Sequence, residues 1–154
     1  MEKKGCEACF EFFNSGGTGG FNCAESTMYG ITQVLGIENE DFQRLATPFG
    51  GGLGRNGKIC GSLMVGMMML GYKFGRNDPN ELRAPGYAAA DELLEKFQNK
   101  IGHLNCRDIT GLDLKAIDNT GEAKQKVHYE ICRPLVKQVC EWVSEMYNRE
   151  DAKE

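Results

Sequence analysis

The stretch CGSLMVGMMMLGYKFG, from Cys60 to Gly75, indicates the fold class of this chain. Its apolar run is too long for a typical strand and contains no internal turn signal, so it predicts a buried helix. The methionines cover several faces of this helix, which favours adaptable packing over a copper site. Since the rest of the sequence offers no strand pairs or hairpin signals, we expect an all-α protein.

Further helices are predicted on both sides of this stretch. Asn22 is expected to cap a helix that has Glu25 at the capping-box position and ends at Gly36. Pro134 suits the first turn of a final helix, because that position needs no amide donor. The other expected helical segments are residues 6–13, 39–48 and about 85–100, with one or two turns beginning near Cys106.

Length and composition predict one domain. With 154 residues and 41% hydrophobic content, the chain can bury a core of its own. We expect a single-domain bundle of about five to six helices over residues 1–154. A four-cysteine domain would occupy about residues 10–143, and residues 1–9 and 148–154 would form frayed ends.

Charge and hydropathy exclude two classes of partner. The net charge is −4, and the lysines and arginines are scattered among 22 acidic residues, which argues against nucleic-acid binding. The longest apolar run, Gly61 to Tyr72, is shorter than the roughly 20 residues that a bilayer span needs. We therefore expect a cytoplasmic protein without a membrane span.

The loop FGGGLGRNGKICG, from Phe49 to Gly61, matches two phosphate-binding patterns at once. A phosphate loop requires a preceding strand and a Ser or Thr after its lysine. Here a helical pattern precedes the loop, and Ile59 follows Lys58. We interpret the glycines instead as close-approaching backbone that presents Cys60.

Seven cysteines are many for such a chain, and in a reducing compartment they indicate metal binding or redox chemistry before a disulfide scaffold. Four of them lie at predicted helix starts. Free amides and the helix dipole would lower the pKa of a thiol there and favour the thiolate. The alternative is that each is a small core residue. We expect these sulfurs to lie close together, and we call them the four-cysteine group: Cys23, Cys60, Cys106 and Cys132.

The segments FNCAES, FGGGLGRNGKICGSLMVGMMMLG, GHLNCRDITG and CRPLV resemble the redox-active C_GCAxxG_C_C family. The resemblance covers roughly Phe10 to Val143 and implies that the four-cysteine group holds the family's four cysteines. Ser62 stands where the family motif has alanine, and the next glycine falls one place late, at Gly66. Similar domains occur fused to cytochrome c in split-Soret type proteins, where an iron–sulfur site has been proposed. The resemblance thus implies a cluster, but no haem, because Phe10 follows Cys9 where an attachment motif has histidine.

Three functions compete for the four-cysteine group. Its thiolates could ligate an iron–sulfur cluster for electron transfer, two of them could cycle between dithiol and disulfide, or all four could hold structural zinc. The first two functions require a redox partner protein, and a homo-oligomer is compatible with all three. No enzymatic reaction is assigned.

The remaining candidates lie outside this group. His103 is a weaker candidate ligand, three residues before Cys106, and His128 is expected on a helix surface. Cys6 and Cys9 have redox spacing without a second such pair. Cys140, among apolar neighbours, is most simply a core residue.

Overall fold

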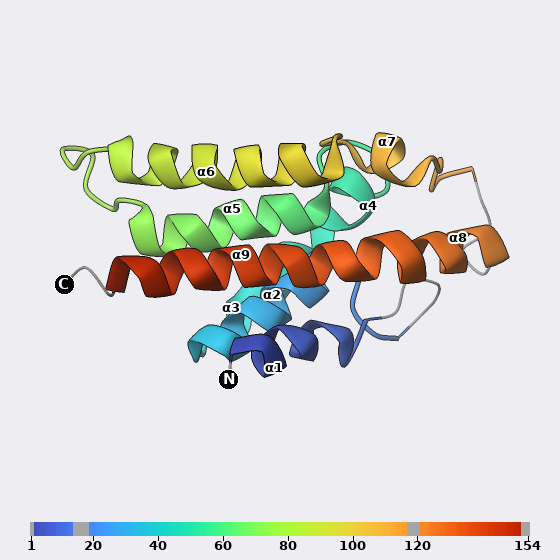
Figure 1. Cartoon of the computed structure of the whole chain (residues 1–154), viewed down its shortest axis with the longest axis horizontal. Coiled ribbons are helices and arrows are strands. Elements are labelled where there is room, and N and C mark those ends of the chain that lie inside the picture. The colour runs from blue at the N-terminus through green and yellow to red at the C-terminus, as the bar shows by residue number, and fades with distance from the viewer. Residues whose placement is uncertain (1, 14–18, 117–120, 152–154) are drawn as a thin grey trace.

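The structure is a computed structural model that describes residues 2–13, 19–116 and 121–151, and it confirms the all-α fold (Figure 1). Two isolated β-bridges are the only sheet-like pairing in these ranges. Five of the described helices have seven residues or more, in agreement with the expected five to six. They are α2 (Cys23–Leu35), α3 (Glu40–Ala46), α5 (Gly61–Phe74), α6 (Ala84–Ile101) and α9 (Arg133–Asp151).

Shorter helical pieces connect these five. The first, α1 (Glu2–Glu7), continues into the 3₁₀ turn η1 (Ala8–Phe10). The 3₁₀ turn η2 (Thr47–Phe49) and α4 (Gly50–Leu53) follow α3. The remaining pieces are α7 (Cys106–Thr110), α8 (Glu122–Val127) and the π turn η3 (His128–Cys132).

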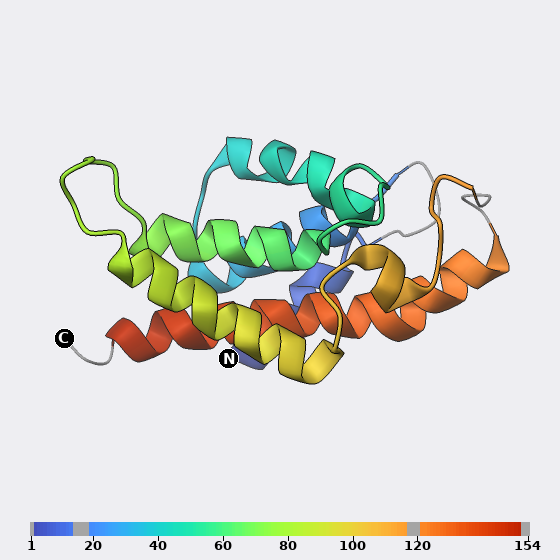
Figure 2. The same cartoon turned by 90° about the horizontal axis from the view of Figure 1, so that it is seen from above.

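Helices α2, α5 and α9 pack against one another and form the centre of the bundle, and α6 lies beside α5 (Figures 1 and 2). The predicted buried helix α5 contributes Leu63, Val65 and Met69, each at most 2% exposed. Gly66 explains how closely α5 approaches its neighbours. A Cβ atom there would lie 2.9 Å from Val139 of α9 and 3.0 Å from Leu93 of α6. The glycine therefore sits where three helices meet.

Helix α2 has the boundaries that its sequence predicts. The Asn22 side chain accepts a 2.9 Å hydrogen bond from the Glu25 amide, and the Glu25 carboxylate accepts a 2.8 Å bond from the Asn22 amide. Gly36 ends the helix with φ of 64°, in the left-handed region that glycine tolerates best. This capping box fixes the place where Cys23 begins the helix.

Pro134 lies in the first turn of the final helix α9, as predicted. The sequence did not predict that α8 and η3 precede it without a break, so that α8, η3 and α9 form one continuous rod along the long axis of the molecule (Figure 1). Proline inside a helix cannot donate to the carbonyl four residues before it, here that of Glu130. The π turn accommodates this, because the Arg133 amide donates to the His128 carbonyl, five residues back.

The N-terminal residues were expected to be helical over residues 6–13, with a frayed end over residues 1–9. The described part of this segment is helical from Glu2 to Phe10, and the side chains of Cys6 and Cys9 are each 1% exposed. Among the described helices, none combines the length and the apolar character that crossing a membrane demands.

Candidate four-cysteine site

Three members of the four-cysteine group lie at helix starts, as predicted. Cys23 is the first residue of α2, Cys60 is the N-cap of α5, and Cys106 is the first residue of α7. The prediction is wrong for Cys132, which ends the π turn inside the long C-terminal rod. Segments α4, α7 and η3 meet at one end of the bundle, where α5 begins.

A short antiparallel pairing fixes Cys60 and Cys106 relative to each other. Ile59 and Asn105 form a β-bridge, so the two cysteines follow paired residues. The Cys60 amide donates to the Leu104 carbonyl at 2.8 Å, and the Cys106 amide donates to the Lys58 carbonyl at 2.7 Å. These backbone hydrogen bonds alone fix the positions of both cysteines relative to each other.

The glycine loop packs directly against this pairing. Gly52 has φ of 69°, and a Cβ atom there would lie 2.7 Å from the Cβ of Cys106. Gly57 has φ of 68°, and its added Cβ would lie 2.9 Å from the Cβ of Arg107. Helix α3 and the turn η2 precede the loop where a phosphate loop would have a strand, and the Lys58 side chain is exposed. The glycines therefore allow close backbone approach, as we interpreted them.

Burial and mutual repulsion dominate the electrostatics of the four-cysteine group. Burial raises the pKa of Cys60 to about 12, with further contributions from negative charge on Cys23 and Cys106. Burial and the charge of Cys23 raise the pKa of Cys106 to about 11. The pKa of Cys132 is also raised, by burial first and then by charge on the other three thiols. The four sulfurs thus lie within electrostatic reach of one another.

We expected the helix starts to lower the pKa values of these thiols, and this expectation is wrong. The amide donors behind it are present, but the pKa values are raised. Backbone amides of Gly51 and Ala24 form hydrogen bonds with the Cys23 sulfur, but burial outweighs them and the pKa of Cys23 is raised. Amides of Ser62 and Leu63 act in the same way on Cys60. Desolvation disfavours the thiolate more than these donors stabilise it.

Two threonines that were not predicted as part of the site, Thr27 and Thr110, support it. The Thr27 hydroxyl donates to the Cys23 carbonyl at 2.7 Å and lies 2.7 Å from the Ser62 hydroxyl. Ser62, the departure from the family motif, thus has a buried polar partner. A hydrogen bond with the Thr110 side chain lowers the pKa of Cys106, against the larger effect of burial. The only sequence signal is a threonine four residues after Cys23 and another four residues after Cys106.

Within residues 2–13, 19–116 and 121–151, no three Cys, His, Asp or Glu side chains are grouped so that they could hold a metal ion. A tetrahedral zinc site has Zn–S distances of about 2.3 Å, which places its sulfurs roughly 3.8 Å apart. The four-cysteine group therefore does not form a preformed single-ion site. His103, the weaker candidate ligand, is exposed, and the pKa of Cys106 is shifted by burial, Cys23 and Thr110.

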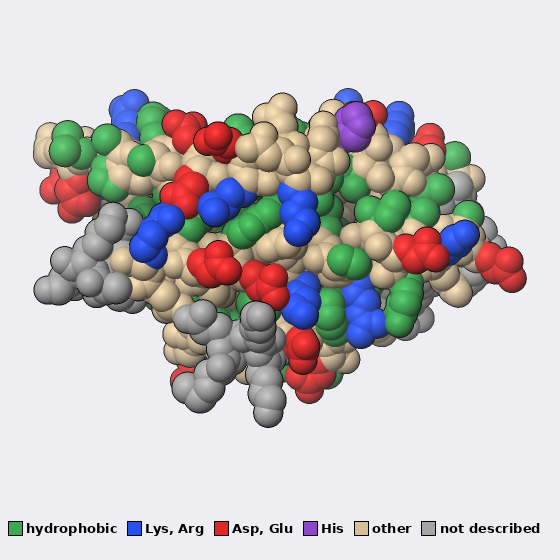
Figure 3. All heavy atoms as spheres, in the orientation of Figure 1, with side chains coloured by type: hydrophobic (Ala, Val, Ile, Leu, Met, Phe, Trp, Pro, Cys, Tyr) green, Lys and Arg blue, Asp and Glu red, His purple; other side chains and the backbone are tan. Residues whose placement is uncertain are grey.

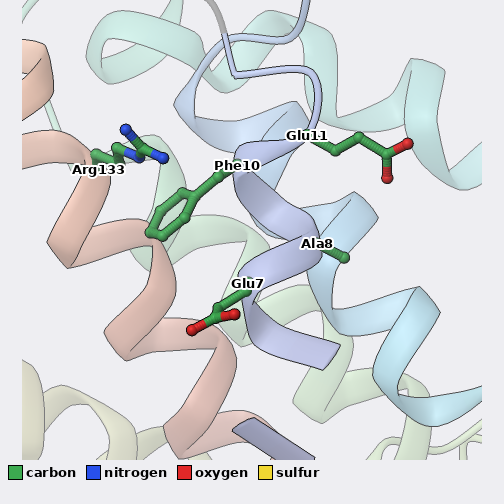
Figure 4. A pocket seen from close by; sticks show the side chains of 5 residues that line it. All are labelled: Glu7, Ala8, Phe10, Glu11 and Arg133. Carbon is green, nitrogen blue, oxygen red and sulfur yellow. The ribbon is translucent and has the colours of Figure 1, made fainter. Parts of the chain in front are cut away.

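A surface hollow lies elsewhere, between the N-terminal segment and the start of α9 (Figure 4). The Arg133 guanidinium lies over the Phe10 ring, 4.3 Å from its centroid. The hollow is lined by Glu7, Ala8, Phe10, Glu11 and Arg133.

On the face drawn in Figure 3, basic and acidic side chains are interspersed. This face therefore carries no continuous basic surface of the kind that binds nucleic acid.

The fold and the site define a class: all-α proteins that gather four cysteines, distant in sequence, at one end of a helical bundle. The family model described as "Putative redox-active protein (C_GCAxxG_C_C)" matches residues 21–146, and the chain belongs to this family. An uncharacterized protein of Archaeoglobus fulgidus is 33% identical over 107 residues, which cover 63% of this chain and 71% of the relative. No solved structure matches the chain.

Proposed function

We propose that the protein is an electron carrier in which Cys23, Cys60, Cys106 and Cys132 ligate an iron–sulfur cluster. Membership of a redox-active family supports a redox role in general. The specific proposal depends on the chemistry of the four thiols and their surroundings. A bound cluster would supply one-electron chemistry, and a separate redox partner protein would deliver and accept the electrons.

The observation that carries the proposal is the raised pKa of all four thiols, caused by burial and, for three of them, by charge on other members of the group. Four thiolates held together without a cation repel one another. A bound cation relieves this repulsion and favours deprotonation of every ligand. One disulfide would neutralise two thiols and leave the other two facing each other.

The surrounding backbone fits thiolate ligands. Amides of Gly51, Ala24, Ser62 and Leu63 already form hydrogen bonds with the sulfurs of Cys23 and Cys60. Such donors stabilise negative charge on ligand sulfur and help to set the reduction potential of a cluster. In this proposal the chain's own residues bind the cluster, orient the sulfurs and limit the access of water.

Two alternatives remain, and the spacing of the cysteines in the sequence ranks them. Structural zinc usually takes cysteines in close C-x-x-C pairs, which Cys23, Cys60, Cys106 and Cys132 do not form, so zinc ranks last. A metal-free dithiol couple is the second candidate, and the free thiols of all four cysteines favour it.

The test is the iron and sulfide content of protein expressed and purified anaerobically with ample iron. We expect bound iron in the wild type and a loss of it in each single Cys→Ser variant of the four. Cys9→Ser is the matched control, since it removes a buried thiol outside the group, and it should retain iron. Iron-free wild type with one reversible disulfide among the four would favour thiol exchange, and stoichiometric zinc would favour a structural site.

A further inference from the structure

The other three cysteines form a second group, which we call the N-terminal thiol group: Cys6, Cys9 and Cys140. Cys6 belongs to α1, Cys9 to η1 and Cys140 to α9. Their side chains are 1%, 1% and 0% exposed. Cys6 and Cys9 precede the region that the family model matches, and Cys140 lies within it. This group shares no member with the four-cysteine group.

Gly30 of α2 explains how the three thiols come together. A Cβ atom at this position would lie 2.8 Å from the Cβ of Cys9 and 3.4 Å from the sulfur of Cys140. Because glycine has no side chain, the N-terminal segment and α9 can both pack against the same turn of α2. The glycine thus lies between two segments that are far apart in sequence.

Polar contacts link Cys6 to Cys140 in particular. The thiols of Cys6 and Cys140 lie close enough for each to shift the pKa of the other. The Cys6 sulfur also lies 3.9 Å from the Ser144 hydroxyl, which donates to the Cys140 carbonyl at 2.7 Å. Two buried thiols that share Ser144 as a neighbour need little movement to form a disulfide.

The pKa values of the three thiols differ because their surroundings differ. The Cys140 thiol lowers the pKa of Cys6 against the effect of burial, whereas the pKa of Cys140 is raised strongly. Burial and the charge of Cys6 raise the pKa of Cys9 to about 12. Lys137, which contacts Glu141 at 3.9 Å, lowers the pKa of Cys6 by less than Glu141 raises it. Cys6 has the lowered pKa and lies on the short helix α1, so we assign it as the nucleophile of the group.

We propose that Cys6 and Cys140 form a second redox-active dithiol, which low-molecular-weight disulfides oxidise. The Cys6 thiolate attacks one sulfur of the external disulfide, whose S–S bond breaks and releases one thiol after protonation. The mixed disulfide on Cys6 is neutral, so it no longer disfavours ionisation of Cys140. Cys140 then loses its proton, attacks the Cys6 sulfur and releases the second thiol. Two electrons and two protons pass from the protein to the external disulfide.

Local opening of the N-terminal segment gives the oxidant access. Helix α1 has only six residues, and a helix of that length is marginal without its tertiary contacts. After oxidation, the Cys6–Cys140 bond would join this segment covalently to α9. The reaction needs neither the four-cysteine group nor its metal, so it stands whether or not the proposed cluster exists.

The test uses the full chain, kept anaerobic and exposed to mixtures of glutathione disulfide and glutathione. After an acid quench, free thiols are alkylated and the peptides are mapped by mass spectrometry. We expect a peptide joined through Cys6 and Cys140, the loss of these two thiols from alkylation, and a two-electron midpoint. No such peptide at any ratio, or a bond from Cys6 to Cys9 in its place, would overturn the proposal.

Single variants assign the two roles. Cys140→Ser removes the resolving thiol, so one glutathione should remain attached to Cys6. Cys6→Ser should carry no such adduct at Cys140, and Cys9→Ser is the matched control that should still form the bond. An adduct on Cys140 in the Cys6→Ser variant would contradict the assigned nucleophile. Circular dichroism confirms that each variant is folded, and the wild-type peptide map tests the pair without any substitution.

Discussion

At the scale of single residues, Gly57 tests what the glycine loop does. Its φ is 68°, and an added Cβ would lie 2.9 Å from the Cβ of Arg107, next to Cys106. A β-branched residue in this conformation costs roughly 1–2 kcal/mol. Gly57→Val should therefore reduce iron bound after anaerobic reconstitution.

Lys58→Ala is the matched control for this change. Lys58 holds Cys106 through its backbone carbonyl, and its side chain is exposed. The variant should bind as much iron as the wild type. Tight ATP binding that Lys58→Ala abolishes would instead support the phosphate-loop interpretation that we rejected.

Cys9 gives a prediction of pH dependence for the metal-free, reduced protein. Its pKa rises from 9.0 to about 12 in the folded state, because its burial disfavours the thiolate. Between these values the unfolded chain has lost the proton while the folded chain retains it. The free energy of unfolding should therefore fall as pH rises, by about 1.4 kcal/mol per pH unit from this group.

Urea unfolding of wild type and Cys9→Ser between pH 7 and pH 11 measures this effect. The difference in unfolding free energy between the two proteins should be constant below about pH 8. Above pH 9 the variant should lose stability less steeply than the wild type. Parallel curves over the whole range would show that Cys9 ionises equally in both states.

At the scale of elements, the π turn η3 positions Cys132. Pro134→Ala restores an amide that can donate to the Glu130 carbonyl, so the rod can continue as an ordinary α-helix. One residue of helix corresponds to about 100° of rotation, which would turn Cys132 away from its partners. We expect less bound iron with unchanged or higher stability toward urea.

Pro85→Ala is the matched control for this substitution. Pro85 lies in the first turn of α6, where a missing amide has no partner to lose. This variant should retain iron. If Pro134→Ala also retains full iron content, the π turn is not needed to position Cys132.

The helices show how much of the structure could be predicted from the sequence. The start and end of α2 follow from Asn22, Glu25 and Gly36, because caps act through neighbours in the chain. Three of the four helix-start cysteines follow from the same local signals. The place of Cys132 could not be predicted, because a proline in the first turn of a helix and a proline after a π turn have the same local sequence pattern. The N-terminal thiol group depends on packing around Gly30, which no local pattern reports.

At the scale of the whole molecule, α9 connects two separate thiol groups. Cys132 and Cys140 are eight residues apart in the chain, about 12 Å along a helix. Gly66 brings α5 close to α9 and α6 in the same bundle. The two proposals therefore assign different chemistry to different parts of one rod: single electrons at the four-cysteine group and electron pairs at the N-terminal thiol group.

Electron paramagnetic resonance during a redox titration tests the central claim most directly. Protein purified under strict anaerobic conditions is titrated stepwise with a chemical reductant. We predict a paramagnetic signal that appears or disappears as one electron is added, with a one-electron midpoint, and that is lost in Cys60→Ser. Iron-free protein that gives no signal over the whole range, and shows a two-electron midpoint with a disulfide among Cys23, Cys60, Cys106 and Cys132, would contradict the account.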